Sequence, residues 1–131
     1  MLPENHRLLR AAGFLKILQA KAYGGYELGV PVLVECVLEL AQGCASDAWV
    51  TSLCASQNRF VGCYAKEAQD EVYAASGADL MTCLVTGPTT TAVKADGGYR
   101  LTGRWPYVSG VDQCNWLLLS AFDPEIGRAH V

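Results

Sequence analysis

Residues 97–116 read GGYRLTGRWPYVSGVDQCNW and carry more information than any other stretch of the chain. The pair Asp96-Gly97 that opens it is typical of a two-residue hairpin turn, whose central residues favour positive φ. Over residues 99–105, aromatic or apolar residues alternate with polar ones, which predicts a half-buried strand. Pro106 has no N–H to donate, so we expect the regular ladder to end there. The stretch therefore predicts a hairpin arm that runs into irregular backbone.

The irregular backbone after Pro106 places a flat ring and a hydroxyl close together in the sequence. Tyr107 supplies the ring, and Ser109, just before Gly110, supplies the hydroxyl. A tyrosine ring adds contact area at low entropic cost, and a hydroxyl can both donate and accept a hydrogen bond. We expect this pair to suit a planar heteroaromatic ligand. The alternatives are a turn serine that caps the bend and a tyrosine in the core.

Length and composition set the class of protein. The chain has 131 residues, of which 51% are hydrophobic, and a net charge of −3. These values are typical of a chain that folds around a packed core, and the absence of a basic run argues against a nucleic-acid partner. The most apolar window, residues 30–40, contains two glutamates and is too short and too charged to span a bilayer. With no signal-peptide pattern at the N-terminus, we expect a cytoplasmic protein without membrane association.

Six cysteines are many for a chain of this length: Cys36, Cys44, Cys54, Cys63, Cys83 and Cys114. No two of them have the C-x-x-C spacing of a zinc or redox site, so we expect no metal site. We expect reduced, buried thiols that pack as small hydrophobic side chains. A disulfide framework is the alternative.

The last residues, 125–131, read EIGRAHV. The codons GAG-ATC-GGA-AGA-GCA-CAC-GTC encode this string and resemble a common sequencing-adapter read. We therefore expect a non-native tail, leave it out of the prediction of the fold, and exclude His130 as a candidate ligand. An ordinary polar tail is the alternative.

The first half of the chain has helical periodicity. The spacing of apolar residues predicts helices over residues 3–12, 31–42, 46–60 and 66–75. Pro31 suits the N1 position of the second helix, Gly43 its C′ position, and Ser46 the N-cap of the third. Trp49 is expected to anchor the packing of that third helix. One apolar stripe is predicted to be the buried face of the second helix: Val30, Leu33, Val34, Val37, Leu38 and Ala41.

The periodicity changes in the second half. Short runs of β-branched and apolar residues predict strands over residues 80–86, 89–94, 99–105 and 115–121. Helices followed by strands, without alternation, predict an α+β fold or two domains, with the boundary near residues 77–79.

Several motifs, in this order along the chain, resemble those of the acyl-CoA dehydrogenase superfamily. They are Pro3-Glu4, Leu8-Leu9, Gly13-Phe14, Tyr23-Gly24-Gly25, residues 45–50, residues 67–72 and residues 97–116. Within that superfamily the chain resembles the flavin-dependent monooxygenases of two-component systems, which are similar to aromatic hydroxylases. The last motif is the specific one, and the order of the motifs adds to it.

The resemblance implies a fold and a domain arrangement. Residues 1–78 would form the helical N-terminal domain, without the family's first helix. Residues 79–124 would supply the first strands of a small antiparallel β-barrel, which is the middle domain. The C-terminal helix bundle of the family would be missing from the chain.

The resemblance also implies the site residues. Ser109 falls where the family places a hydroxyl at flavin N5, and Tyr107 where an aromatic ring lies against the isoalloxazine. The backbone of Cys83, Leu84, Val85 and Thr86 falls where the family meets the pyrimidine edge of the flavin. Arg104 faces either a flavin phosphate or water.

One departure from the family pattern favours the monooxygenase branch. Residues 86–91 read TGPTTT, without the acid and the Gly-Ser-Asp that acyl-CoA dehydrogenases usually have there. The branch implies reduced FMN or FAD, O2, a separate flavin reductase, a small organic substrate, with an aromatic one favoured, and a homotetramer.

A second departure concerns the catalytic acid–base group. Aromatic hydroxylases of this group usually carry a histidine at the end of the third helix, and here Gln57 stands at that position. A glutamine can hydrogen-bond a substrate hydroxyl but cannot take its proton at neutral pH. We therefore place Gln57 in the substrate pocket, where oxygenation of a nucleophilic carbon, sulfur or nitrogen fits as well as phenol hydroxylation. The alternative is a solvent-facing helix residue.

Two other functions stay open. One is an acyl-CoA dehydrogenase that oxidises an acyl thioester with FAD. The other is a non-catalytic piece, since 131 residues that lack one wall of the site are expected to bind no flavin and to aggregate through open sheet edges.

Overall fold

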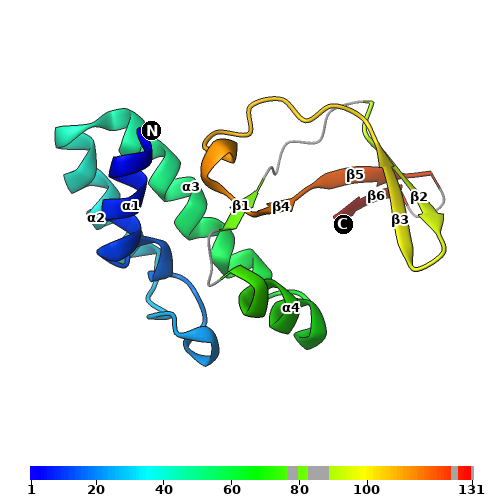
Figure 1. Cartoon of the computed structure of the whole chain (residues 1–131), viewed down its shortest axis with the longest axis horizontal. Coiled ribbons are helices and arrows are strands. Elements are labelled where there is room, and N and C mark those ends of the chain that lie inside the picture. Colours follow the sequence, from blue (N-terminus) through cyan, green and yellow to red (C-terminus); the bar gives the residue numbers. More distant parts are fainter. Residues whose placement is uncertain (77–79, 83–88, 125–126, 131) are drawn as a thin grey trace. The chain divides into compact units, whose positions relative to one another are not determined.

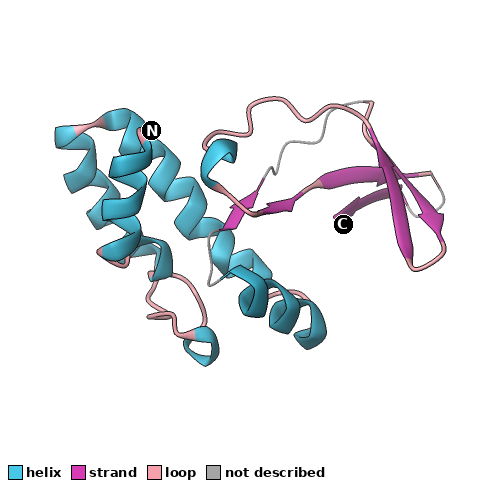
Figure 2. Cartoon of the chain, in the orientation of Figure 1, coloured by secondary structure: helices cyan, strands magenta, loops and turns pink. Residues whose placement is uncertain are grey.

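A computed structural model describes residues 1–76, 80–82, 89–124 and 127–130. The chain forms two compact units. The first comprises Met1–Met81 and Ser109–Trp116, and the second comprises Thr82–Val108 and Leu117–Val131. The helical segments, cyan in Figure 2, all belong to the first unit, and the four-stranded sheet belongs to the second. The α+β class is therefore as predicted.

Four helices and three short 3-10 turns build the first unit (Figure 1). The helices are α1 (Pro3–Ala11), α2 (Val30–Gly43), α3 (Ala45–Val61) and α4 (Lys66–Ser76), and the turns are η1 (Phe14–Lys16), η2 (Lys21–Tyr23) and η3 (Val111–Gln113). All four predicted helices are present.

Helix α3 has more buried residues than α1 or α2. Its inward side mixes small, apolar and polar residues: Asp47, Ala48, Val50, Thr51, Cys54, Ala55, Gln57, Asn58 and Val61. Ala55 packs with Ile17, Leu18 and Leu33 in a cluster that joins α3 to α2 and to the segment around η1. The Asn58 amide donates to the Leu15 carbonyl at 2.7 Å, and both residues are buried. A buried, directional hydrogen bond of this kind fixes the register between two segments as well as stabilising them.

The junction of α2 and α3 differs from the prediction. Gly43 is the last residue of α2, without positive φ, and Ser46 lies inside α3, so neither has the capping role that we expected. Cys44 alone separates the two helices, in an extended conformation at φ −155°. It donates its N–H to the Leu40 carbonyl and accepts from Ala48, so one residue ends one helix and starts the next. This arrangement leaves no place for a left-handed glycine or a serine cap.

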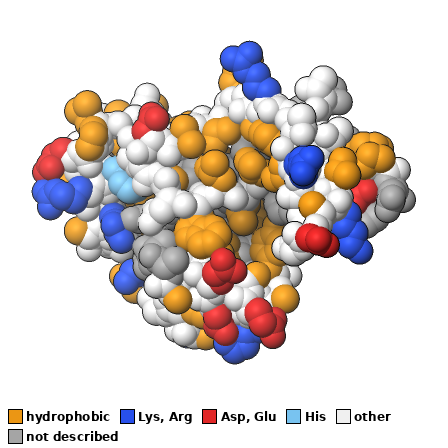
Figure 3. Space-filling model, turned by 45° about the vertical axis from the view of Figure 1, so that its right-hand side comes forward, with side chains coloured by type: hydrophobic (Ala, Val, Ile, Leu, Met, Phe, Trp, Pro, Cys, Tyr) orange, Lys and Arg blue, Asp and Glu red, His pale blue; other side chains and the backbone are white. Residues whose placement is uncertain are grey.

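The predicted apolar stripe of α2 is largely exposed. Of its six members only Leu33 is buried, whereas Leu38 is 63% exposed. The helix packs through Leu33, Cys36 and Val37, which lie one turn apart. Because α2 has apolar residues on both sides, the hydrophobic pattern did not identify the side that packs. Figure 3 shows hydrophobic side chains (orange) reaching the molecular surface on the face drawn there.

A four-stranded sheet has the order β3-β2-β5-β6, and a two-stranded sheet pairs β1 with β4. The strands are β1 (Leu80–Thr82), β2 (Thr91–Ala95), β3 (Gly98–Thr102), β4 (Trp116–Leu118), β5 (Ser120–Asp123) and β6 (Gly127–His130). The β2–β3 and β5–β6 pairs are antiparallel, whereas β2 and β5 pair in parallel at Thr91 and Phe122. The remainder of the first predicted strand, residues 83–86, lies outside the described residues.

The hairpin of β2 and β3 turns at Asp96-Gly97, as predicted, but only Gly97 has positive φ. The strand that we expected over residues 99–105 ends at Thr102, and its residues are mostly exposed. Gly103, at φ +151°, breaks the ladder before Pro106 does, and a Cβ at this position would collide with Thr90. The strand expected over residues 115–121 is two strands, β4 and β5, separated at Leu119.

A further expectation was wrong in part. Cys54 is buried as expected, but Cys44 and Cys63 are exposed; the five cysteines that the structure describes are free thiols.

Residues 127–130, which we left out of the prediction of the fold, pair with β5 from Ser120 to Asp123. That residues 125–131 are a non-native, adapter-derived tail stays a prediction.

Replacing Gly25 should destabilise the first unit. A Cβ at Gly25 would collide with the Gln19 backbone carbonyl, which already accepts a hydrogen bond from Glu27 and has little freedom to move. We expect Gly25→Ala, in the complete gene product, to lower the free energy of unfolding by about 1–3 kcal/mol. Gly43→Ala is the control, because a Cβ there meets nothing within 4 Å. In urea denaturation, Gly43→Ala should leave the free energy of unfolding unchanged or raise it by up to about 1 kcal/mol. A clear decrease in the free energy of unfolding would instead support the C′ role of Gly43.

Candidate functional site

Ser109 begins the segment that returns to the helical unit. Gly110 follows at φ +85° and is the N-cap of η3. The Gln113 N–H donates to the Gly110 carbonyl at 3.0 Å, which closes the turn. The side chain of Ser109 is half-buried, and its hydroxyl accepts a hydrogen bond from the indole N–H of Trp49 at 3.4 Å. The turn serine therefore has a partner on α3, a helix 60 positions away in sequence.

Trp49 is not the packing anchor that we expected. Its side chain is 60% exposed, while its neighbours Ala48 and Val50 are buried. Because successive helix residues point in different directions, burying both neighbours turns Trp49 outward. The sequence contained a signal for this exposure, since Trp49 is flanked by a small residue, Ala48, and a β-branched residue, Val50. An exposed indole beside a hydroxyl is a surface that a flat ligand can cover.

Tyr107 belongs to the second unit and has unusual backbone geometry. It is 89% exposed and has φ +60°, one of two described non-glycine residues with positive φ. A bulky residue in this region is strained by about 1–3 kcal/mol, which is most common at functional sites. The alternative of a core tyrosine is wrong, because its ring lies in solvent.

Gln57 lies on α3 and is buried, with 3% of its surface exposed. The alternative of a solvent-facing residue is therefore wrong. Its side-chain oxygen, Oε1, is inaccessible to solvent and has no hydrogen-bond partner among the described residues. A buried carbonyl without a donor costs about 1–3 kcal/mol, so this atom is suited to accept a bond from a ligand or an ordered water. The side-chain nitrogen of the neighbouring Asn58 donates to the Leu15 carbonyl, whereas the Asn58 side-chain oxygen is also without a partner among the described residues.

The remaining predicted flavin contacts, at Cys83, Leu84, Val85 and Thr86, lie outside the described residues. Arg104 is exposed. Within the described parts of the chain, no group of three or more histidines, cysteines or carboxylates could hold a metal ion. Searched over the same residues, no helix combines the length and the apolar character that crossing a membrane requires.

One ionisable cluster, formed by Tyr23, Lys66, Asp70 and Tyr73, connects two elements of the first unit. On α4, Lys66 and the hydroxyl of Tyr23 hold the pKa of Asp70 below its usual value by hydrogen bonding to the carboxylate. The ring of Tyr23 stacks on Tyr73, with centroids 4.4 Å apart. Burial raises the pKa of Tyr73 to about 12. These contacts attach η2 to α4.

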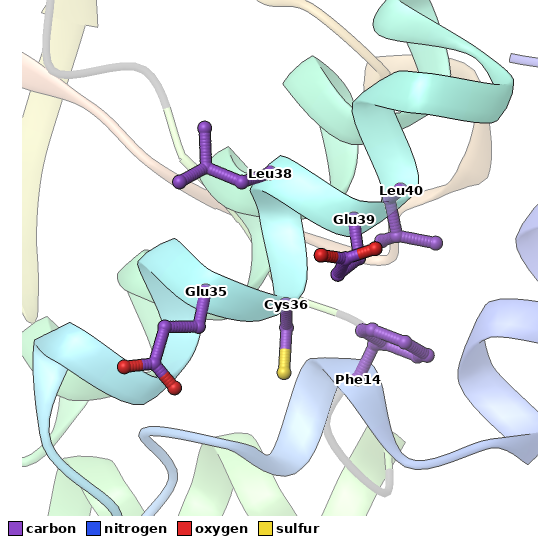
Figure 4. Close-up of a pocket in the computed structure, with 6 residues that line it drawn as sticks. All are labelled: Phe14, Glu35, Cys36, Leu38, Glu39 and Leu40. Atoms are coloured by element: carbon purple, nitrogen blue, oxygen red, sulfur yellow. The ribbon is translucent and has the colours of Figure 1, made fainter.

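One open pocket lies elsewhere in the first unit. It has a volume of about 650 Å³ and is lined by Phe14, Glu35, Cys36, Leu38, Glu39 and Leu40. In Figure 4, Phe14 and Cys36 lie across from one another, whereas Leu38 points to the other side of α2. None of the predicted site residues lines it, and its only charged groups are two carboxylates. It offers no group that could recognise an anion or a flavin phosphate.

No protein-family model matches the chain. The chain is 35% identical over 124 residues to the oxygenase component of an FADH2-dependent resorcinol hydroxylase from Rhizobium sp. (strain MTP-10005), covering 94% of this chain and 30% of that protein. It matches the crystal structure of the 3-HSA hydroxylase from Rhodococcus sp. RHA1 with a TM-score of 0.87 at 25% identity, over 100% of this chain and 33% of that one.

A second solved structure is XiaF from Streptomyces sp. in complex with FADH2 and glycerol. The TM-score is 0.85 at 29% identity, over 98% of this chain and 33% of that one. The chain thus spans about 30% of the length of the curated relatives that it matches. It is homologous over that length to the oxygenase components of two-component flavin-dependent monooxygenases, the branch of the acyl-CoA dehydrogenase superfamily that its sequence motifs resemble.

Proposed function

We propose that the complete gene product is the oxygenase component of a flavin-dependent monooxygenase, which uses reduced flavin and O2 to oxygenate a small aromatic substrate. One relative is named as an FADH2-dependent resorcinol hydroxylase and another as a p-hydroxyphenylacetate 3-hydroxylase. The single observation in this chain that carries the proposal is the half-buried Ser109 hydroxyl beside the exposed Trp49 ring. The names of these relatives favour oxygenation over dehydrogenation of an acyl thioester.

The described residues fit a flavin. Trp49 and Tyr107 each present most of an aromatic ring to solvent, which is costly unless a partner covers it. Ser109 has a hydroxyl that can serve as donor or acceptor, so it suits a ring nitrogen in either redox state. Gln57 keeps a buried oxygen without a donor. Aromatic faces, a hydroxyl and a free carbonyl are the groups that a heteroaromatic ligand and a hydroxylated substrate need.

We assign the roles as follows. Ser109 binds flavin at N5, Tyr107 lies against the isoalloxazine, and the backbone of residues 83–86 meets the pyrimidine edge. Bound reduced flavin, FMN or FAD, supplies the two electrons that reduce one atom of O2 to water while the other atom enters the substrate. The chain's own residues bind and orient the two ligands and exclude water from them.

Gln57 orients the substrate without exchanging protons. Its Oε1 accepts a hydrogen bond from a substrate hydroxyl, and its amide has no proton to take up or release at neutral pH. The substrate must therefore bring a carbon that is already nucleophilic, or lose its proton to another group. This supports an electron-rich aromatic substrate, such as one with several hydroxyl groups.

The partners follow from the same proposal. A separate flavin reductase supplies the reduced flavin, O2 is the co-substrate, and the complete protein is a homotetramer in the cytoplasm. Residues 1–78 belong to its helical domain and residues 79–124 to its strand domain.

Removing the Ser109 hydroxyl should impair flavin binding. We expect Ser109→Ala, in the complete gene product, to weaken the binding of reduced flavin by about two- to ten-fold, the value of one hydrogen bond. It should also raise the share of O2 that is released as hydrogen peroxide. Anaerobic titration and peroxide assays measure these effects. Ser46→Ala, at an exposed position of α3, is the control and should change neither; wild-type affinity and coupling in Ser109→Ala would contradict the role of Ser109.

Gln57 and Asn58 should respond in opposite ways to the same substitution. Gln57→Leu removes a buried oxygen without a partner, so thermal unfolding of the ligand-free protein should show unchanged stability or a gain of up to about 1 kcal/mol. Asn58→Leu breaks the bond to Leu15 and should cost about 1–3 kcal/mol. Substrate titration should show Gln57→Leu binding a phenolic substrate several-fold more weakly. A loss of stability in Gln57→Leu equal to that of Asn58→Leu, with unchanged substrate affinity, would make Gln57 a structural residue.

A further inference from the structure

The hydrogen bond between Trp49 and Ser109 has a consequence for the direction of the serine hydroxyl. An indole N–H is a donor and has no acceptor, so in this pair the serine oxygen must be the acceptor. A serine hydroxyl has one proton and two lone pairs, and it rotates to suit its partners. With one lone pair directed at Trp49, the proton points elsewhere. The indole therefore leaves one donor and one lone pair of Ser109 available to a ligand.

The two residues are held by different parts of the first unit. Trp49 is fixed by α3, whose neighbouring residues Ala48 and Val50 are buried. Ser109 lies at the start of the η3 turn, next to Gly110, where a loop arrives from the second unit. Among the described residues, the Trp49 indole is the one hydrogen-bond partner of the Ser109 hydroxyl. The hydrogen bond from Trp49 thus fixes the orientation of the serine hydroxyl relative to α3, rather than relative to the loop that carries Ser109.

We propose that Trp49 is a positioning residue, whose indole N–H orients the Ser109 hydroxyl so that its free proton and lone pair face the flavin. This inference rests on the proposed function, which assigns Ser109 to the flavin. It adds a distinct requirement: the ring of Trp49 is not sufficient, and its N–H is needed. Trp49→Phe keeps an aromatic ring and removes only the donor and the second ring, at an exposed position where folding should be preserved.

Two measurements on the complete gene product test this. The first is the ultraviolet resonance Raman band that reports hydrogen bonding of the indole N–H, taken without flavin and assigned to Trp49 by difference against Trp49→Phe. Ser109→Ala should shift this band to the position of an unbonded indole. Trp105→Phe is the matched control: it removes another indole bond, to the Ser120 carbonyl at 2.8 Å, and should leave the Trp49 band in place.

The second measurement is a double-mutant cycle on the affinity for reduced flavin. Trp49→Phe and Ser109→Ala should each weaken binding by about two- to ten-fold, and the double variant should bind no more weakly than Ser109→Ala alone. Additive losses, or a Trp49 band that does not move in Ser109→Ala, would overturn the inference while leaving Ser109 as a flavin contact. If Ser109→Ala left flavin affinity unchanged, the proposed function of Ser109 would fail, and the positioning role with it.

Discussion

The hydrogen bond from the Asn58 amide to the Leu15 carbonyl is the contact on which the helical unit depends most. It is formed where both residues are buried, so neither group can recover its loss from water. It fixes α3 against the segment around η1, and the cluster of Ile17, Leu18, Leu33 and Ala55 packs beside it. Apolar packing alone would permit small sliding of one segment along the other, whereas a directional bond to one carbonyl does not.

The positions of the candidate site residues on α3 depend on this hydrogen bond and the packing beside it. Because α3 has a fixed register, the direction in which Trp49 leaves the helix is fixed as well. The segment that starts at Ser109 then meets that indole through a side-chain bond rather than through backbone pairing. The side chain of Ser109, a loop residue, is thereby held in place by a residue of a helix. Binding groups on loops are commonly positioned by rigid elements in this way. Gln57, two turns further along α3, shares the same support, and its buried side-chain oxygen, like that of Asn58, has no hydrogen-bond partner among the described residues.

Much of the fold could be predicted from local patterns, because helix periodicity, the Asp96-Gly97 turn and β-branched runs act within a few residues. The errors arose where packing decides. The sequence of α2 has apolar residues on two sides, and only the contacts of Leu33 select one of them. The single residue Cys44 between α2 and α3 replaced two predicted caps. The parallel pairing of β2 with β5 joins segments about 30 residues apart, which no local pattern encodes.

The site could be predicted only in part. The motif around Ser109 and the family resemblance predicted roles for Tyr107, Ser109 and Gln57, and these roles stay predictions. The exposure of Trp49 could not be predicted, since a tryptophan on a helix is usually buried. Its exposure follows from which neighbours the fold buries, and its partner lies 60 positions away.

The most direct test is a crystal structure of the complete gene product with reduced flavin bound. We predict that the Ser109 oxygen lies about 3 Å from a nitrogen of the flavin ring while it still accepts a hydrogen bond from the Trp49 indole. A flavin bound at a distance from Ser109, or a serine hydroxyl turned away from the ring, would contradict it.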